Sequence, residues 1–299
     1  MEVMQFELNQ SMKQTQKEWG NKSPWIAIII AVAALIVSDF LSTFLSLPLI
    51  INQKSLPAEV AQLIDTLTNL GSFGVLLLVL LLANKFILKK STESLGFYKQ
   101  NWIKQYGLGA AIGSIMLIVV YLLSLLTGGA QTVFNPDTSV LIIFGYLIGF
   151  LIQGMTEEVL TRSLIMNVFS AKKGVVYGII INSIFFSLMH GINSGIDILA
   201  LINLFLAGIF FSLLFYWSGS IWVAGAAHSL WNFVQGPILG VKVSGASMPN
   251  ALLTTDLFEN RALLNGGNFG LEGGLIDTLI SIIACVILWK LCQRKGLIH

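Results

Sequence analysis

Long apolar runs alternate with short polar segments along most of the chain. An α-helix rises 1.5 Å per residue, so about 20 apolar residues cross the hydrocarbon core of a bilayer. The pattern therefore predicts an all-α, polytopic bundle of about eight transmembrane helices. The predicted spans are 25–50, 69–88, 106–127, 139–169, 174–193, 196–217, 220–239 and 274–292.

The polar segments define the predicted domain organisation. Residues 1–24 form a polar tail without the small-residue cleavage site of a signal peptide, so we expect a cytoplasmic tail. A single transmembrane domain is expected at 25–295. Its longest polar interruption is a glycine-rich outer loop at 241–273. That stretch fits a lid or a loose loop, and the loop is the preferred interpretation.

Lysine and arginine positions orient the bundle. An even number of spans places both termini on one side. Of the 17 lysines and arginines, all but four lie on that side: Lys54, Lys242 and Arg261 lie on the other, and Arg162 lies within a span. Because basic residues concentrate on the cytoplasmic side, both termini are predicted to be cytoplasmic. We expect a multi-pass protein of the plasma membrane.

Composition agrees with a lipid environment. Only 11% of the 299 residues are charged and 55% are hydrophobic, whereas a soluble domain carries roughly 25% charged residues. Membrane lipids are the expected surroundings, and the net charge of +2 gives no indication of nucleic-acid binding. Three glycine pairs spaced four residues apart, Gly109/Gly113, Gly145/Gly149 and Gly174/Gly178, predict close helix packing.

Ionisable residues inside the spans cluster in three of them. The fourth span carries Glu157, Glu158 and Arg162, the fifth carries His190 and the seventh carries His228. A charged group inside a bilayer costs about 2.5–3.5 kcal/mol, so such residues are functional candidates by default. A glutamate together with two histidines favours a site over a packing role.

Helical spacing separates the two glutamates. Glu158 and Arg162 are four residues apart and are predicted to form an ion pair that supports the site. Glu157 points about 100° away around the helix and lacks that partner. His228 and Asn232 are also four residues apart, so both side chains can face one cavity.

Depth in the membrane gives a second comparison. Glu157 and His190 each lie about 16 residues from the predicted turn near Lys172–Gly174, so both are about 24 Å from it. Antiparallel helices therefore bring these two residues to the same level. His228 lies only about 12 Å beyond the connection at Ser218–Ser220. This mismatch predicts a tilted or re-entrant seventh span.

Other polar residues in the spans are expected to have supporting roles. Asp39 is predicted to face a water cavity or a helix partner. Asn203 and Gln235 are predicted to form interhelical hydrogen bonds, and Asn182 shares a helical stripe with His190.

These residues resemble the motifs of the CPBP family, which comprises the CAAX proteases and the bacteriocin-processing (Abi) membrane proteases. Three motifs are matched in order: E-E-x-x-x-R by Glu157, Glu158 and Arg162, F-x-x-x-H by Phe186 and His190, and H-x-x-x-N by His228 and Asn232. The resemblance covers residues 94–236. It implies an intramembrane endopeptidase of the Rce1-like glutamic type, with this segment as its protease core and Phe186 in support.

Peptide hydrolysis assigns the expected roles. Glu157 is the predicted general base for a water that His190 positions, while His228 and Asn232 donate to the oxyanion. No cofactor is favoured. In an alternative scheme, zinc is held by Glu157, His190 and His228, which is an acceptable catalytic ligand set. That scheme would leave Glu158 as the spare base.

Two further classes of function stay open. One is a non-catalytic membrane protein, such as an immunity protein that masks a membrane target. The other is a transporter with an intramembrane ion site, although the two halves of the chain show no repeat of the polar cluster. For a protease, the expected partner is a peptide or protein substrate, lipidated or membrane-bound.

Overall fold

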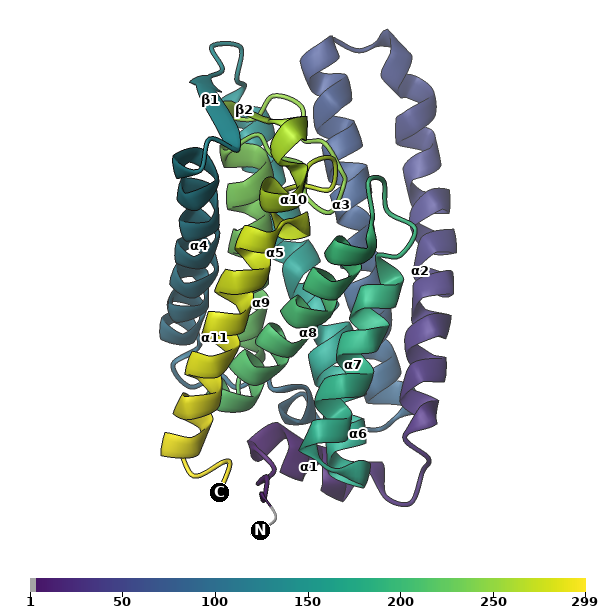
Figure 1. Ribbon diagram of the computed structural model, residues 1–299. Coiled ribbons are helices and arrows are strands. Elements are labelled where there is room, and N and C mark those ends of the chain that lie inside the picture. Colours follow the sequence, from purple (N-terminus) through teal and green to yellow (C-terminus); the bar gives the residue numbers. More distant parts are fainter. Residues whose placement is uncertain (1–3) are drawn as a thin grey trace.

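The structure is a computed structural model that describes residues 4–299, except for the side chains of residues 52 and 54. Long helices run side by side, and both ends of the chain lie at the same end of the bundle (Figure 1). The α-helices are α1 (Gln10–Trp19), α2 (Trp25–Asn52), α3 (Ala58–Leu82), α4 (Trp102–Leu126), α5 (Val140–Glu158), α6 (Asn167–Lys173), α7 (Val175–Met189), α8 (Ile198–Ser218), α9 (Ile221–Phe233), α10 (Ala262–Asn265) and α11 (Leu275–Arg294).

Other regular elements connect or extend these helices. The π-helical segments Ala83–Ile87, Val159–Met166 and Val234–Ile238 continue α3, α5 and α9. Short 3₁₀ helices are Gln53–Ser55, Glu93–Leu95, Glu259–Arg261 and Leu271–Gly273. Strands β1 (Ala130–Phe134) and β2 (Leu253–Leu257) form an antiparallel pair.

The polytopic helical bundle predicted from hydropathy is confirmed. Within the described residues, six helical stretches are long and apolar enough to cross a membrane: Trp25–Ile51, Ala58–Ile87, Trp102–Leu126, Val140–Lys173, Ile198–Ser218 and Leu275–Arg294. The other two predicted spans correspond to α7, an apolar helix of 15 residues, and to α9 with its π-helical extension. α3 begins well before residue 69, because its first turns stay helical although they carry Glu59 and Asp65.

The N-terminal tail contains a helix that hydropathy alone does not reveal. α1 begins after Asn9, whose side chain accepts a hydrogen bond from the Met12 amide (3.0 Å). The helix buries Met12 and Trp19 and packs against α6. Beside it, the amide of Gln5 donates to the carbonyl oxygen of His299 (2.9 Å). The two ends of the described chain therefore meet on one face, as an even number of spans requires.

Glycines permit close helix contacts at the predicted pairs. A Cβ added to Gly109 or Gly113 would lie 2.1 or 2.0 Å from a backbone carbonyl oxygen of α9. A Cβ added to Gly145 or Gly149 would lie 2.7 or 2.5 Å from leucine side chains of α3. In the third pair, only Gly178 is crowded, by α6 and the π-helical segment before it. The first two pairs set the distances between the helices that carry and flank the site.

Unequal helix lengths explain the depth mismatch of His228. Val140–Lys173 is one continuous helical stretch of 34 residues, about 51 Å long against a hydrocarbon core of about 30 Å. Its end reaches α1 at the terminal face of the bundle (Figure 1). The α8–α9 connection lies deeper, where the Ile221 amide donates to the carbonyl oxygen of Gly96 (3.1 Å). His228 therefore reaches the level of Glu157 with fewer residues.

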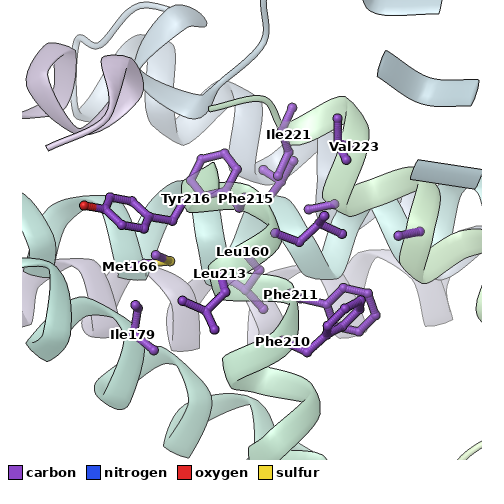
Figure 2. Close-up of a cluster of buried hydrophobic side chains, with 14 of the residues drawn as sticks. Leu160, Met166, Ile179, Phe210, Phe211, Leu213, Phe215, Tyr216, Ile221 and Val223 are labelled. Carbon is purple, nitrogen blue, oxygen red and sulfur yellow. The ribbon is translucent and has the colours of Figure 1, made fainter. Parts of the chain in front are cut away.

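An apolar core holds the helices below the site. Figure 2 shows Leu160 of the π-helical segment, Phe215 and Tyr216 of α8 and Ile221 of α9 packed together, and all four are fully buried. In lipid such packing stabilises through van der Waals contact, because the surrounding acyl chains are equally apolar. The Tyr216 hydroxyl lies 2.6 Å from the carbonyl oxygen of Leu297 and ties this core to the C-terminus.

The outer segment 241–273 is joined to the bundle by hydrogen bonds. It contains β2, α10 and two 3₁₀ helices. In the strand pair, Thr132 lies opposite Thr255, and their hydroxyl groups are 2.9 Å apart. The Thr255 hydroxyl also donates to the carbonyl oxygen of Leu239 (2.5 Å). Part of this segment lines the cavity described next.

Candidate active site

Glu157 lies at the centre of a polar cluster formed by α5, α7 and α9. Its Oε1 accepts a hydrogen bond from Gln153 Nε2 (2.6 Å), one helical turn away. Its Oε2 is buried without a hydrogen-bond partner among the described residues. That oxygen lies 3.9 Å from His190 Nε2 and 3.8 Å from His228 Nε2. These separations are too long for direct hydrogen bonds and match those that a water molecule bridges.

The hydrogen bonds of the two histidines fix which ring nitrogen faces Glu157. His190 Nδ1 lies 2.9 Å from the carbonyl oxygen of Phe186. A carbonyl oxygen only accepts, so Nδ1 carries the proton and donates. His228 Nδ1 likewise donates to Glu158 Oε1 (2.9 Å). Both rings therefore turn Nε2 toward the free oxygen of Glu157.

Glu158 forms the ion pair with Arg162 that the spacing predicts. The Arg162 Nη1 to Glu158 Oε1 distance is 2.9 Å, and both side chains are fully buried. Arg162 Nη2 also donates to the carbonyl oxygen of Gly208 (3.2 Å). Glu158 Oε1 also accepts a hydrogen bond from His228 Nδ1, so the ion pair fixes the imidazole through the nitrogen that does not face Glu157.

Aromatic rings enclose the charged groups. The guanidinium carbon of Arg162 lies 4.8 Å from the centre of the Phe186 ring and 5.4 Å from that of Phe211. Phe211 also stacks on His228 with a centroid distance of 4.9 Å and an interplanar angle of 19°. Phe186 contacts the His190 ring at 4.7 Å. These rings restrict both imidazoles and offset part of the desolvation cost of the guanidinium.

Local backbone features bring α5 and α9 together at this level. A Cβ added to Gly154 would lie 2.4 Å from the backbone nitrogen of Ser229, so glycine is required for the contact. The chain changes from α-helix to π-helix at Val159, directly after the two glutamates. Such π-helical segments frequently accompany functional sites, because they shift the side chains that follow.

Gln153 is a site residue that the sequence reasoning missed. Its Oε1 accepts a hydrogen bond from Asn232 Nδ2 (2.9 Å), and its Nε2 donates to Glu157. This relay uses one of the two amide hydrogens of Asn232. The available signal was the four-residue spacing between Gln153 and Glu157 on one helix face. Phe211 was also missed, and nothing distinguishes it from other aromatics of its apolar run.

A cavity of about 510 Å³ adjoins the cluster. This volume lies within the range of about 300–1,000 Å³ typical of ligand pockets. Apolar side chains of α2 and α3 and the outer residues 243–246 form parts of its wall. The polar residues lining it are Gln153, Glu157, His190, Asn193, Ser194, Asn203, His228, Asn232, Ser244, Glu272, Asp277 and Ser281.

The remaining polar residues of the spans lie elsewhere. Asn203 accepts a hydrogen bond from Thr278 of α11 (2.6 Å), which confirms an interhelical role. Asn182 donates to Ser212 of α8 (2.9 Å) and does not line the cavity. Gln235 donates to the carbonyl oxygen of Lys242, just beyond its own helix, so its predicted interhelical bond is wrong.

Asp39 does not take the position expected from its place in the first span. Its side chain is exposed on α2 and lines no part of the cavity. The prediction of a water cavity or helix partner for Asp39 is therefore wrong for the described residues. A hydropathy pattern gives the depth of a residue but not the face of the helix on which it lies.

The metal-ligand set considered from the sequence was also compared with the geometry. Within residues 4–299, no group of three or more His, Cys, Asp or Glu side chains is arranged to hold a metal ion. Zinc bonds to histidine nitrogen at about 2.0–2.1 Å. A zinc ion on Glu157, His190 and His228 would therefore require these side chains to rearrange.

The site thus places one free carboxylate oxygen between two imidazoles at a cavity within the helical bundle. Residues 139–234, from the start of α5 into the end of α9, match the family model Rce1-like, described as type II CAAX prenyl endopeptidase Rce1-like. Residues 139–234 are thus similar to the CAAX-protease family, and the resemblance drawn from the three motifs is confirmed. Similarity to this family supports the function of an intramembrane endopeptidase. Comparison with curated proteins finds no match to the chain.

Proposed function

We propose that the protein hydrolyses a peptide bond with a water molecule activated by Glu157. The observation that carries the proposal is the free Oε2 of Glu157, buried beside the Nε2 atoms of His190 and His228 in a cavity large enough for a peptide segment. A water between these atoms would donate one proton to Oε2 and present its oxygen to a substrate carbonyl. His190 would orient that water through Nε2.

The reaction follows from this placement. The water oxygen forms a bond to the carbonyl carbon while Glu157 takes the water proton. The carbonyl electron pair moves onto oxygen and gives a tetrahedral oxyanion. When the C–N bond breaks, the electron pair of the oxyanion re-forms the carbonyl group, and the proton on Glu157 passes to the leaving nitrogen.

His228 and Asn232 are the proposed donors to the oxyanion. Glu158 accepts the Nδ1 proton of His228 and stabilises a doubly protonated ring, whose Nε2–H then points into the cavity. Asn232 has a second amide hydrogen besides the one donated to Gln153. Preorganised donors of this kind lower the barrier by about 3–4 kcal/mol each.

The substrate class follows from the walls of the cavity. Apolar residues of α2 and α3, such as Leu70 and Phe73, face the same space as Glu157. We therefore propose that the substrate is a peptide or protein that is membrane-bound or lipidated. We also propose that this multi-pass protein lies in the plasma membrane. The same apolar walls offer no basic groove for nucleic acid.

Comparative proteomics of membranes tests the activity. Membranes with the wild-type protein should contain cleavage products that are missing with Glu157→Gln. Glu259→Gln, an exposed glutamate of the outer segment, is the matched control and should keep every product. An unchanged set of products in Glu157→Gln would contradict hydrolysis. If this variant also retained the biological effect of the protein, the binding-protein interpretation would replace it.

We favour a scheme without metal, because zinc would engage Glu157 as a ligand, and the remaining base candidate, Glu158, is paired with Arg162. Activity of the purified protein should survive a chelator such as EDTA or 1,10-phenanthroline. Complete loss that added zinc restores would assign a zinc ion to Glu157, His190 and His228 and would make Glu158 the remaining base.

A further inference from the structure

Two carboxyl groups that the proposed hydrolysis does not use share the cavity with Glu157. They are Glu272, in the 3₁₀ helix Leu271–Gly273, and Asp277, in the first turn of α11. Both lie outside residues 139–234, which carry the Rce1-like domain. Residues beyond that domain therefore contribute charge to the space where a substrate would lie.

Glu272 is held in place by the outer segment. One of its carboxylate oxygens accepts hydrogen bonds from the backbone amide and the hydroxyl of Ser244, the latter at 2.7 Å. The other oxygen forms no hydrogen bond within the described part of the chain. Glu272 lines the same cavity as His190 and His228.

Asp277 is buried with little compensation. It is 2% exposed, and its only hydrogen bond among residues 4–299 comes from the Ser281 hydroxyl at 3.4 Å. An ionised carboxylate offers about four acceptor positions, so most of its capacity is unused. Asp277 and Glu272 also interact electrostatically, which increases the cost of keeping both charged.

An independent observation indicates that this cavity lacks a ligand group. Glu157 Oε2, in the same cavity, is a buried carboxylate oxygen without a partner among the described residues. No lysine or arginine of the described chain lines the cavity. Buried carboxylates are stable only when paired or neutralised. A cation with hydrogen-bond donors would pair the carboxyls of Glu272 and Asp277.

We propose that Glu272 and Asp277 form a specificity subsite for a positively charged substrate side chain, so that the enzyme prefers a lysine or arginine close to the scissile bond. This inference rests on the proposed peptidase function and names its substrate class. An ammonium or guanidinium group would donate to the free oxygens of both residues. The apolar walls would hold the neighbouring residues of the substrate.

Structural roles of the two carboxyls do not compete with this assignment. Asp277 in the first turn of α11 also interacts favourably with the helix dipole, and Glu272 also anchors Ser244. Glu272→Gln keeps an acceptor oxygen for Ser244, and Asp277→Asn keeps the shape of the side chain and an acceptor for Ser281. The small dipole contribution of Asp277 is lost with its charge, but it does not depend on a bound cation. Charge recognition does not persist, so the amide variants separate the roles.

Binding of a small cation tests the subsite without relying on catalysis. Benzamidine is positively charged, and benzamide has the same shape without charge. In the Glu157→Gln background, benzamidine should bind and raise the unfolding temperature, while benzamide should not. The further substitutions Glu272→Gln and Asp277→Asn should weaken benzamidine binding about 10- to 100-fold. Asp256→Asn, at an exposed position of β2, is the matched control and should leave binding unchanged.

Cleavage preference gives the second measurement. The purified protein is incubated with a peptide library prepared from a digested proteome, and the cut bonds are identified by mass spectrometry. Wild type should enrich lysine or arginine at one position near the cut. Glu272→Gln/Asp277→Asn should still cut but lose that enrichment.

The outcomes separate this inference from the proposed function. Cleavage that depends on Glu157 but shows no basic preference overturns the subsite and leaves the peptidase intact. Equal binding of benzamidine and benzamide, or binding that the amide variants do not weaken, also overturns the subsite. Cationic binding without any cleavage that depends on Glu157 keeps the subsite as a binding site and rejects the peptidase.

Discussion

The buried ion pair of Glu158 and Arg162, which contacts His228, allows a quantitative test. Arg162→Met removes a fully buried guanidinium and leaves the Glu158 carboxylate with His228 as its one hydrogen-bonding partner within the described residues. Breaking a buried pair from one side costs about 3–5 kcal/mol, because the remaining charge is uncompensated. The free energy of unfolding should therefore fall by about this amount. Arg294→Met, at an exposed position of α11, should change it by less than about 0.5 kcal/mol.

A double variant determines whether charge is the cause. In Glu158→Gln/Arg162→Met, both charges are gone, and the amide oxygen can still accept the proton of His228 Nδ1. Replacing a whole buried pair is often nearly neutral, so the double variant should recover about half or more of the loss. Half of the loss is about 1.5–2.5 kcal/mol relative to Arg162→Met.

The assay is denaturant unfolding in detergent micelles, followed by circular dichroism, for the wild type, Arg162→Met, Glu158→Gln, the double variant and Arg294→Met. Additive losses in the double variant, with no recovery, would refute an electrostatic origin. If Arg162→Met lowers the free energy of unfolding no more than Arg294→Met does, the predicted cost of an uncompensated buried charge is refuted.

Three further predictions address the site, the packing and the terminal face. Gln153→Leu removes the donor to the Glu157 carboxylate and should lower kcat about 10- to 100-fold with little change in KM, measured with a quenched peptide. Gly113→Ala should lower the free energy of unfolding by more than about 1 kcal/mol in the same assay, because its Cβ would meet a carbonyl oxygen of α9. Gly107→Ala is the control and should be tolerated, because its Cβ would meet nothing within 4 Å. Burial lowers the pKa of Lys90 to about 8 from 10.5. Between pH 8 and pH 10.5 the unfolded chain therefore binds more protons than the folded protein, so the unfolding temperature should rise with pH. Lys90→Met should abolish this rise in thermal unfolding.

The membrane helices are predictable from sequence because one physical requirement dominates them. A segment that crosses lipid must be apolar over its whole length, and this signal is local. The helix α1 and the strand pair lack it. α1 buries only one face of a polar sequence, and β1 and β2 are separated by more than 100 residues, so their pairing depends on the fold of everything between them.

The site residues are partly predictable for a related reason. Charges are rare in spans, so Glu157, His190 and His228 stand out even without coordinates. Asp277 lies within the predicted span 274–292 and was overlooked, although the same criterion applies to it. Glu272 does not stand out, because polar residues are common where a loop meets a helix. Their place in the cavity comes from the return of α11 alongside α8, which no local pattern reveals.

The central claim is that a water held by Glu157 attacks the peptide bond. Hydrolysis of a peptide by the purified protein in ¹⁸O-labelled water measures this attack directly. Mass spectrometry should find one ¹⁸O atom in the new C-terminal carboxylate with the wild-type protein and no new C-terminus with Glu157→Gln. A labelled product formed at the wild-type rate by Glu157→Gln would contradict the account.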